Sequence, residues 1–404
     1  MTTAETAANW HLARGYRYAG LHCGIRPDRD RRDLALAISD APAAAAGVFT
    51  RNRVRAAPVR VCQERLPAAD VRGVVICSGN ANACTGPQGL ADARRMTAVA
   101  AKAVGCREEQ FLVCSTGVIG RHLPMPAVEA GIERIVPTTR ENGEALAALA
   151  QAIITTDTKI KVSTREVALG GVSVRLTGVV KGAAMIGPNM ATMLAFVFTD
   201  AAVAPAELAT VVTRAAAQTF NCVSVEGHTS TNDTLLLLAN GRAGGSSLHG
   251  EDLNRFGSAV TGVCGDLARA IAADAEGATH LVTIEVEGMR DDTEAYHVAK
   301  TIAESALVKT AIFGADPNWG RFVSAAGYAG VEFEEEQLSL WLGDMLLYHH
   351  GVPQPFDAAT ASAYLKRERH VHLRLRFTLG TGRCTFWTCD LTYEYVKLNA
   401  EYTT

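Results

Sequence analysis

Hydrophobic and polar residues follow two different rhythms along the chain. Short apolar runs are typical of buried strands, whereas longer segments with an apolar residue every three or four positions are typical of amphipathic helices. The short runs predict strands at 73–77, 110–116, 192–200 and 281–288. The longer segments predict helices at 91–104, 141–154, 205–220, 250–275 and 293–308. This mixture of strands and helices indicates an α/β fold.

One segment near the C-terminus, 370–377, alternates strictly between polar and apolar residues. His370 and His372 share its polar face with two arginines. Two histidines at this spacing are compatible with a metal site, but the sequence indicates no third ligand nearby. We therefore interpret this face as the solvent-exposed side of a strand.

The length of 404 residues predicts more than one domain. The clearest breaks in the pattern are the glycine-rich and charged segments 241–250 and 288–295. We place the boundary before the strand that is expected to begin at residue 281. The predicted domains are a catalytic region, 1–280, and a smaller C-terminal α/β domain, 281–404.

Composition and charge exclude several classes of protein. Hydrophobic residues make up 48% of the chain and charged residues 20%, as in ordinary globular proteins. The net charge of −3 argues against a general nucleic-acid binder, which needs a basic face. No apolar run is long enough to span a membrane, and the first residues do not resemble a secretory signal. We therefore expect a cytoplasmic protein with no membrane or nucleic-acid partner.

The familiar cofactor and metal motifs are absent from the sequence. The ten cysteines are scattered and form no C-x-x-C pair, so we expect reduced thiols and no zinc ribbon. There is no G-x-G-x-x-G, no P-loop, no G-x-S-x-G and no H-E-x-x-H. We expect neither a metal nor a cofactor, and any chemistry must come from side chains and the backbone.

The segment 179–193 contains two unusual residues, Lys181 and Thr192. Lys181 is the only charged residue from 179 to 197, and an isolated cation in an apolar stretch usually faces a cleft or pairs with a carboxylate. Thr192 lies between Ala191 and Met193, where a core strand would favour valine and a helix cap would be followed by acidic residues. We interpret this segment as functional.

Three further segments are rich in hydroxyl groups. Thr116 and Gly117 end a predicted strand, where they could form an oxyanion hole, but the residues alone favour an ordinary turn. The segment 153–161 fits a polar ligand site and a helix exit equally well. The segment 226–234 is best explained as a turn before a buried strand.

Taken in order, these segments resemble the ornithine acetyltransferase family of arginine biosynthesis, also called the bifunctional glutamate N-acetyltransferase family. The resemblance covers nearly the whole chain. Its most specific motifs are K-G-x-x-M-I-x-P-x-M-A-T-M-L, D-P-N-W-G-R and the terminal N-x-E-Y-x-T. It implies an N-terminal-nucleophile-like fold, a layered sandwich of mixed β-sheets and helices with a smaller C-terminal α/β domain.

The resemblance also implies a mechanism. The chain would cut itself between Ala191 and Thr192, giving an α chain, 1–191, and a β chain that begins at Thr192. The Thr192 hydroxyl would then be the nucleophile and its new α-amino group the general base, so that no histidine is needed. An acetyl-threonine intermediate would carry the acetyl group from N2-acetylornithine to glutamate in a ping-pong reaction, releasing ornithine and N-acetylglutamate.

Site residues follow from matching positions. Thr116 and Gly117 would stabilise the oxyanion, Lys181 would pair with the substrate α-carboxylate, and Glu276 would face the ornithine side-chain amine. For the hydroxyl contact the resemblance favours Thr155, with Thr156 as the alternative. The full set of implied substrate-binding residues is Thr155, Lys181, Thr192, Glu276, Asn399 and Thr404.

The resemblance leaves several alternatives open. Acetyl-CoA would be a second donor in a bifunctional member, and the chains would assemble as an α2β2 heterotetramer or larger. Departures from the family pattern at Ala184, His228, Ala275 and His280 concern substrate preference, as in relatives of secondary metabolism that act on other N-acyl amino acids. A self-processing amidase or aminopeptidase, which passes the acyl group to water, and an uncut binding protein are the competing hypotheses.

Overall fold

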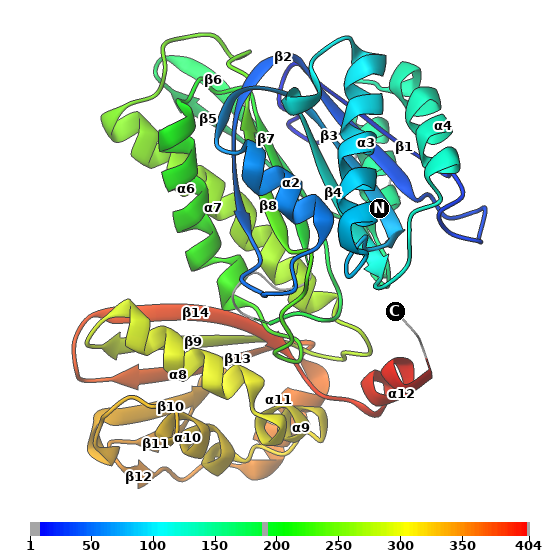
Figure 1. Ribbon diagram of the computed structural model, residues 1–404. Helices are drawn as coiled ribbons and strands as arrows, with labels where there is room; N and C mark the ends of the chain where they lie inside the picture. The colour runs from blue at the N-terminus through cyan, green and yellow to red at the C-terminus, as the bar shows by residue number, and fades with distance from the viewer. Residues whose placement is uncertain (1–8, 188–192, 402–404) are drawn as a thin grey trace.

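Two β-sheets organise the chain (Figure 1). The structure is a computed structural model that describes residues 9–187 and 193–401. The first sheet has the order β4-β3-β2-β8-β7-β6-β5, with β1 paired to β2. Its strands are β1 (Tyr16–Leu21), β2 (Leu34–Phe49), β3 (Ala68–Asn80), β4 (Phe111–Val118), β5 (Lys161–Leu169), β6 (Val172–Lys181), β7 (Leu194–Thr199) and β8 (Thr234–Ala239). The sheet is mixed, because β3–β4 and β7–β8 are parallel pairs and the others are antiparallel.

The long strand β2 joins the two halves of this sheet. Its first part pairs with β1 and β3, its last part pairs with β8, and its register with β3 shifts between Ile38 and Ala45. One buried cluster lies between the halves and contains Ile76 and Leu112 from one half and Phe196 from the other. The two halves therefore pack face to face as the inner layers of a sandwich.

Helices cover the outer faces of this sandwich. On these outer faces α3 and α4 pack against β1–β4, and α6 and α7 pack against β5–β8. α5 packs on β1 and β2 and contributes to the buried cluster between the two halves. These helices, with α2, are α2 (Ala57–Arg65), α3 (Gly86–Val104), α4 (Met125–Ile135), α5 (Gly143–Ile153), α6 (Pro205–Gln218) and α7 (Gly250–Ala273). The layered α/β sandwich expected from the sequence is confirmed.

The second sheet and its helices form the C-terminal part of the chain. Its strands follow the order β12-β11-β10-β13-β9-β14, and β9 and β13 are parallel. The strands are β9 (Leu281–Met289), β10 (Leu338–Leu342), β11 (Met345–His349), β12 (Val352–Pro353), β13 (His370–Phe377) and β14 (Gly382–Cys389). The helices are α8 (Asp292–Glu304), α9 (Ala306–Phe313), α10 (Trp319–Gly327), α11 (Ala358–Arg367) and α12 (Tyr393–Glu401). The division of the chain at residue 280 stays a prediction, although the second sheet begins with β9.

The single helix predicted at 293–308 is wrong. The structure has two helices there, because Ser305 leaves the helical conformation (φ −69°, ψ 113°). The Ser305 side chain accepts a hydrogen bond from the Val308 N–H and so caps the new helix α9. A serine inside a periodic segment can therefore begin a second helix without disturbing the apolar spacing.

Other features of the described residues concern membranes, metals and thiols. No helix within 9–187 and 193–401 is long and apolar enough to cross a bilayer. In the same residues, no group of three or more His, Cys, Asp or Glu side chains is arranged to hold a metal ion. His370 donates to or accepts from the Thr283 hydroxyl, and His372 is exposed on the polar face of β13. All ten cysteines are free.

Candidate active site

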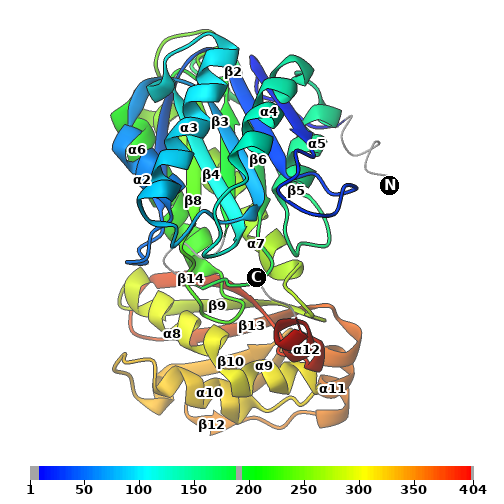
Figure 2. The same ribbon diagram turned by 45° about the vertical axis from the view of Figure 1, so that its right-hand side comes forward.

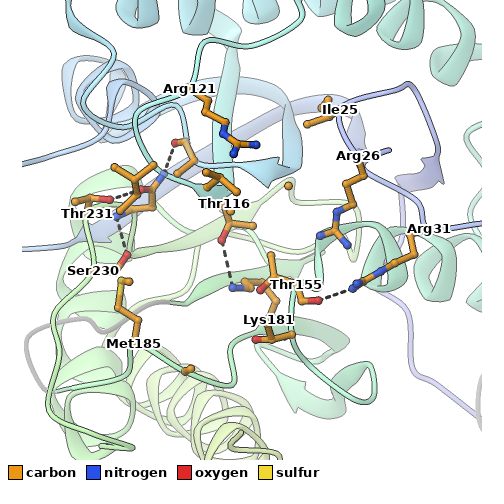
Figure 3. A pocket seen from close by; sticks show the side chains of 18 of the residues that line it. Ile25, Arg26, Arg31, Thr116, Arg121, Thr155, Lys181, Met185, Ser230 and Thr231 are labelled. Carbon is orange, nitrogen blue, oxygen red and sulfur yellow. Dashed lines mark hydrogen bonds between the residues drawn. The ribbon is translucent and has the colours of Figure 1, made fainter. Parts of the chain in front are cut away.

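Six of the predicted site residues line one pocket, which has a volume of about 350 Å³ (Figure 3). The pocket lies where β4 and β6 end and where the loop before β8 approaches them. The six residues are Thr116, Gly117, Thr155, Lys181, Glu276 and Asn399. Thr156, the alternative to Thr155, lines it as well. Ala191, Thr192 and Thr404 lie outside the described residues.

Thr116 and Gly117 belong to the end of β4, so the turn that the residues alone favour is wrong for this pair. Gly117 has φ +131°, and a Cβ there would lie 2.3 Å from the carbonyl carbon of Gly79 on the neighbouring strand. Only glycine fits such a close approach of two backbones. The buried Thr116 hydroxyl oxygen accepts a hydrogen bond from Lys181 Nζ at 3.2 Å, which leaves its own proton available for another acceptor.

Lys181 is the last residue of β6 and is only 2% exposed. Burial lowers the pKa of its ammonium group, and the nearby carboxylate of Asp157 partly opposes that shift. Within the described part of the chain, Lys181 has no carboxylate at ion-pair distance. A buried ammonium group without a paired anion is costly, so this position is suited to a negatively charged ligand.

Behind these residues lies a buried ion cluster, Asp157–Lys161–Asp274, for which the sequence predicts no role. Lys161 Nζ lies 2.6 Å from a carboxylate oxygen of each aspartate. The same Asp157 carboxylate accepts hydrogen bonds from the Gly182 N–H at 2.6 Å and from the Thr155 N–H at 3.1 Å. Asp157 therefore ties the loop that carries Thr155 to the backbone beside Lys181.

Asp274 extends this cluster to the segment that carries Glu276. Its carboxylate accepts hydrogen bonds from the N–H and hydroxyl groups of Thr158. Two residues further on, the Glu276 N–H donates to the carbonyl of Ala183 at 2.9 Å. The cluster thus fixes the spacing between three parts of the pocket wall that are far apart in the sequence.

The C-terminal helix α12 completes the wall around Glu276. Asn399 on α12 donates from Nδ2 to a Glu276 carboxylate oxygen at 3.2 Å. Gly277 has φ +67°, and a Cβ there would lie 2.5 Å from the Tyr395 backbone nitrogen. The helix lies beside the junction of the two sheets (Figure 2), so this close approach brings Asn399 to the pocket.

The hydroxyl-rich segment before β8 is both a turn and part of the site. It precedes β8 as predicted, and Ser230, Thr231 and Asn232 also line the pocket. Next to them, Asp233 accepts a hydrogen bond from the Met193 N–H at 3.1 Å, and burial raises the pKa of the Asp233 carboxyl. Met193 is the residue that follows Thr192, which itself lies outside the described residues.

Three arginines for which the sequence predicts no role also line the pocket: Arg26, Arg31 and Arg121. Arg26 and Arg31 lie in a segment of mixed charge, and Arg121 follows the predicted strand end at Thr116 and Gly117, so no motif singles them out. A basic residue beside a strand end is usually a solvated surface charge, so the pattern alone could not select them.

A hydroxyl, a glycine N–H and a buried ammonium group at neighbouring strand ends can bind a carboxylate and stabilise an oxyanion. Together with the layered α/β fold, this pocket defines an acyl-transferring enzyme.

Comparison with known proteins gives the family. The sequence profile of the ArgJ family matches residues 17–404. The arginine biosynthesis bifunctional protein ArgJ 1 of a Nostoc species is 46% identical over 402 residues, which covers 97% of each chain. The chain belongs to the ArgJ family. The family, the enzyme class and the assignment to arginine biosynthesis expected from the sequence are thereby confirmed.

Two solved structures are also similar to this chain. The crystal structure of the arginine biosynthesis bifunctional protein ArgJ from Bacillus halodurans is 42% identical, with a TM-score of 0.50, and the match covers 51% of this chain and 98% of that one. The ornithine acetyltransferase of Mycobacterium tuberculosis, complexed with ornithine, is 34% identical, with a TM-score of 0.39, and the match covers 45% of this chain and 94% of that one.

Proposed function

We propose that this enzyme transfers an acetyl group from N2-acetylornithine to glutamate through an acetylated Thr192. One observation carries the proposal: every described residue that the family resemblance assigns to the reaction lines the same pocket. These residues come from five separate segments of the chain, so their convergence is a property of the fold and not of sequence proximity.

The pocket chemistry suits an amino acid with a carboxylate and a distal amine. The buried ammonium group of Lys181 would pair with the α-carboxylate, which supplies the anion that this position lacks among the described residues. Glu276, held by Asn399, would receive the δ-ammonium group of ornithine. Thr155 would add a hydroxyl contact, with Thr156 beside it as the alternative, and Thr404 would complete the pocket.

The reaction divides into two acyl transfers. The Thr192 hydroxyl attacks the acetyl carbonyl of acetylornithine, and the Thr192 α-amino group takes the hydroxyl proton and passes it to the leaving nitrogen of ornithine. The amine of glutamate then attacks the acetyl-threonine, and the hydroxyl regains its proton. The Thr116 hydroxyl and the Gly117 N–H would stabilise each oxyanion, at about 2.7–4 kcal/mol for each donor.

A free α-amino group on Thr192 requires the self-cleavage between Ala191 and Thr192. One observation concerns where Thr192 is attached, and a second supports the cleavage. Lys181 pairs in register with Leu194, so the predicted nucleophile is attached close to the strand partner of the predicted carboxylate-binding residue. The matched Bacillus halodurans chain corresponds to only about half of this chain, the length expected of one product of a cut near the middle.

The two products would remain one folded unit. β6 lies before the cut and pairs with β7 after it, and β2 pairs in the same way with β8. Backbone hydrogen bonds of one sheet would therefore hold the α and β chains together. We further propose that the chains assemble into an α2β2 heterotetramer or larger, and that acetyl-CoA is a second donor in place of acetylornithine.

An assay of product partition tests this function. Purified enzyme is incubated with acetyl-labelled acetylornithine in the presence and absence of glutamate. We expect labelled N-acetylglutamate and ornithine in equal amounts, with little free acetate. A product that is mainly acetate at saturating glutamate would favour the amidase alternative, and transfer only from other N-acyl amino acids would favour the secondary-metabolism alternative.

A further inference from the structure

The two amino acids of the proposed reaction carry opposite charges at the ends of their side chains. Ornithine ends in an ammonium group and glutamate in a carboxylate, yet both must place an α-amino nitrogen at the same acetyl-threonine. Glu276 is suited to the first side chain and repels the second, because like charges at close range disfavour each other. The acceptor therefore needs a cationic contact elsewhere in the pocket.

Other residues that line the pocket supply cationic groups. Figure 3 shows the side chains of Arg26 and Arg121 entering from different walls, with their guanidinium ends turned toward the space in front of Thr116 and Thr155. The charged pocket residues are four cations against two carboxylates: Arg26, Arg31, Arg121 and Lys181 against Asp28 and Glu276. An acceptor with two carboxylates fits this excess of positive charge better than the donor, whose own charges cancel.

The arginines differ in how far the protein already engages them. Arg31 donates to the carbonyl of Thr155, and Arg26 donates from Nη2 to the carbonyl of Ile154 at 2.5 Å, so both hold the loop that carries Thr155. The guanidinium of Arg121 makes no hydrogen bond or ion pair with any other residue in the described part of the chain. Arg121 lies three residues after Val118, the last residue of strand β4, which carries the proposed oxyanion hole.

Arg26 also acts on the site electrostatically. Its charge is one of the causes that lower the pKa of Lys181, so the two cations repel each other across the pocket. A ligand with two carboxylates, one at each cation, would relieve that repulsion.

We propose that Arg121, supported by Arg26, forms an anion subsite for the side-chain carboxylate of the acceptor glutamate. The pocket then has a cation-binding wall at Glu276 for the donor and an anion-binding wall at the arginines for the acceptor, with Lys181 serving the α-carboxylate of both. The planar guanidinium group is suited to this role, because it binds a carboxylate through two parallel hydrogen bonds. This inference rests on the proposed function.

Two assays on the same enzyme, ornithine exchange and acetyl transfer to glutamate, distinguish the donor-binding wall from the acceptor-binding wall. Exchange of labelled ornithine into acetylornithine, without glutamate, reports only the donor half-reaction. Transfer to glutamate, with acetylornithine as donor, reports the acceptor half-reaction. For Arg121→Gln we expect the KM for glutamate to rise about 10- to 100-fold, the range for losing a hydrogen bond to a charged group, while the exchange rate stays within about twofold.

Two further variants make the result specific. Arg121→Lys keeps the charge but not the planar fork, and should give an intermediate KM for glutamate. Arg29→Gln removes an exposed positive charge near Arg26 in the sequence without touching the pocket lining, and should leave both reactions unchanged. Equal loss of exchange and transfer in Arg121→Gln would overturn the subsite in favour of a general structural role, and so would no change in either.

The same positive groups could instead receive the phosphates of acetyl-CoA. Phosphate-free assays with acetylornithine as donor exclude acetyl-CoA as the ligand. If Arg121→Gln raised only the KM for acetyl-CoA and not the KM for glutamate, the glutamate assignment would be overturned. A wild-type enzyme that shows no exchange at all would contradict the proposed reaction itself, and the subsite would fall with it. If instead wild-type exchange is normal and Arg121→Gln changes nothing, only the arginine subsite is contradicted and the proposed reaction stands.

Discussion

Asp157→Asn is the substitution that most directly tests the buried ion cluster behind the pocket. The change keeps the size of the side chain but removes its charge. It leaves Lys161 with one carboxylate in place of two, and it replaces one acceptor oxygen with an NH₂ group that cannot accept from Gly182 or Thr155. The contacts of Asp157 with Lys161 and Gly182 are buried, so water cannot compensate for their loss.

The structure gives the size of the effect. Burial by itself would raise the pKa of the Asp157 carboxyl, but the positive charges of Lys161 and Lys181 outweigh it and lower this pKa from 3.8 to about 2. That difference corresponds to about 2–3 kcal/mol of folding free energy at neutral pH. Removing one partner of a buried ion pair costs about 3–5 kcal/mol, and Lys161 keeps Asp274. We therefore expect a loss of about 2–4 kcal/mol.

Urea unfolding of the wild type and of Asp157→Asn at several pH values measures this loss of unfolding free energy. Because the folded pKa is lowered, the contribution of Asp157 is present at neutral pH and is lost as the pH falls from about 4 to about 2. The difference in unfolding free energy between wild type and variant should become smaller over that pH range. Asp266→Asn is the control, since its ion pair with Arg165 at 3.0 Å is largely exposed and should contribute about 0–1 kcal/mol. An Asp157→Asn loss no larger than this control would refute the reasoning.

Three other predictions concern single groups. Burial raises the pKa of Glu226 from 4.5 to about 8, so the unfolding free energy of the wild type should fall as the pH rises between these values. Glu226→Gln should remove this pH dependence and stabilise the protein by up to about 3 kcal/mol at pH 7, measured by urea unfolding. The hydrogen bond to Asp390 raises the pKa of His280, so this pair stabilises the fold fully below the ordinary histidine pKa and less at higher pH. In thermal unfolding, His280→Gln should therefore lose more stability at pH 5.5 than at pH 8.5. Thr116→Val should lower kcat for acetyl transfer about 10²- to 10³-fold with little change in stability, and an unchanged kcat would remove Thr116 from the oxyanion hole.

Much of the fold could be predicted from periodicity, but not β2 or α12. The strands β4 and β9 and the helix α6 carry clear apolar rhythms, and their predicted positions agree closely with the structure. β2 contains many alanines, pairs with different strands along its length and shows no alternation, so no pattern marks it. α12 has no buried residue, and its position depends on the close approach at Gly277, which a sequence does not display.

The site divides in a similar way. Thr116, Lys181 and Glu276 were selected by family resemblance, and the pattern of residues alone supported only Lys181. The role of Asp157 could not be predicted, because its partner Asp274 is far along the chain and joins it only through the buried Lys161. Charge clusters of this kind depend on tertiary packing, whereas strand and helix periodicity is local.

Denaturing mass spectrometry tests the central claim, that Thr192 is both the self-cleaving and the acetyl-carrying residue. Wild-type protein and Thr192→Ala are each analysed before and after brief exposure to acetylornithine without glutamate. We predict that the wild type gives two chains divided between Ala191 and Thr192, that the β chain gains one acetyl group, and that glutamate removes it. Thr192→Ala should remain one chain without the adduct. A wild type that stays a single chain of 42.8 kDa, or an acetyl group on the α chain, would contradict the account.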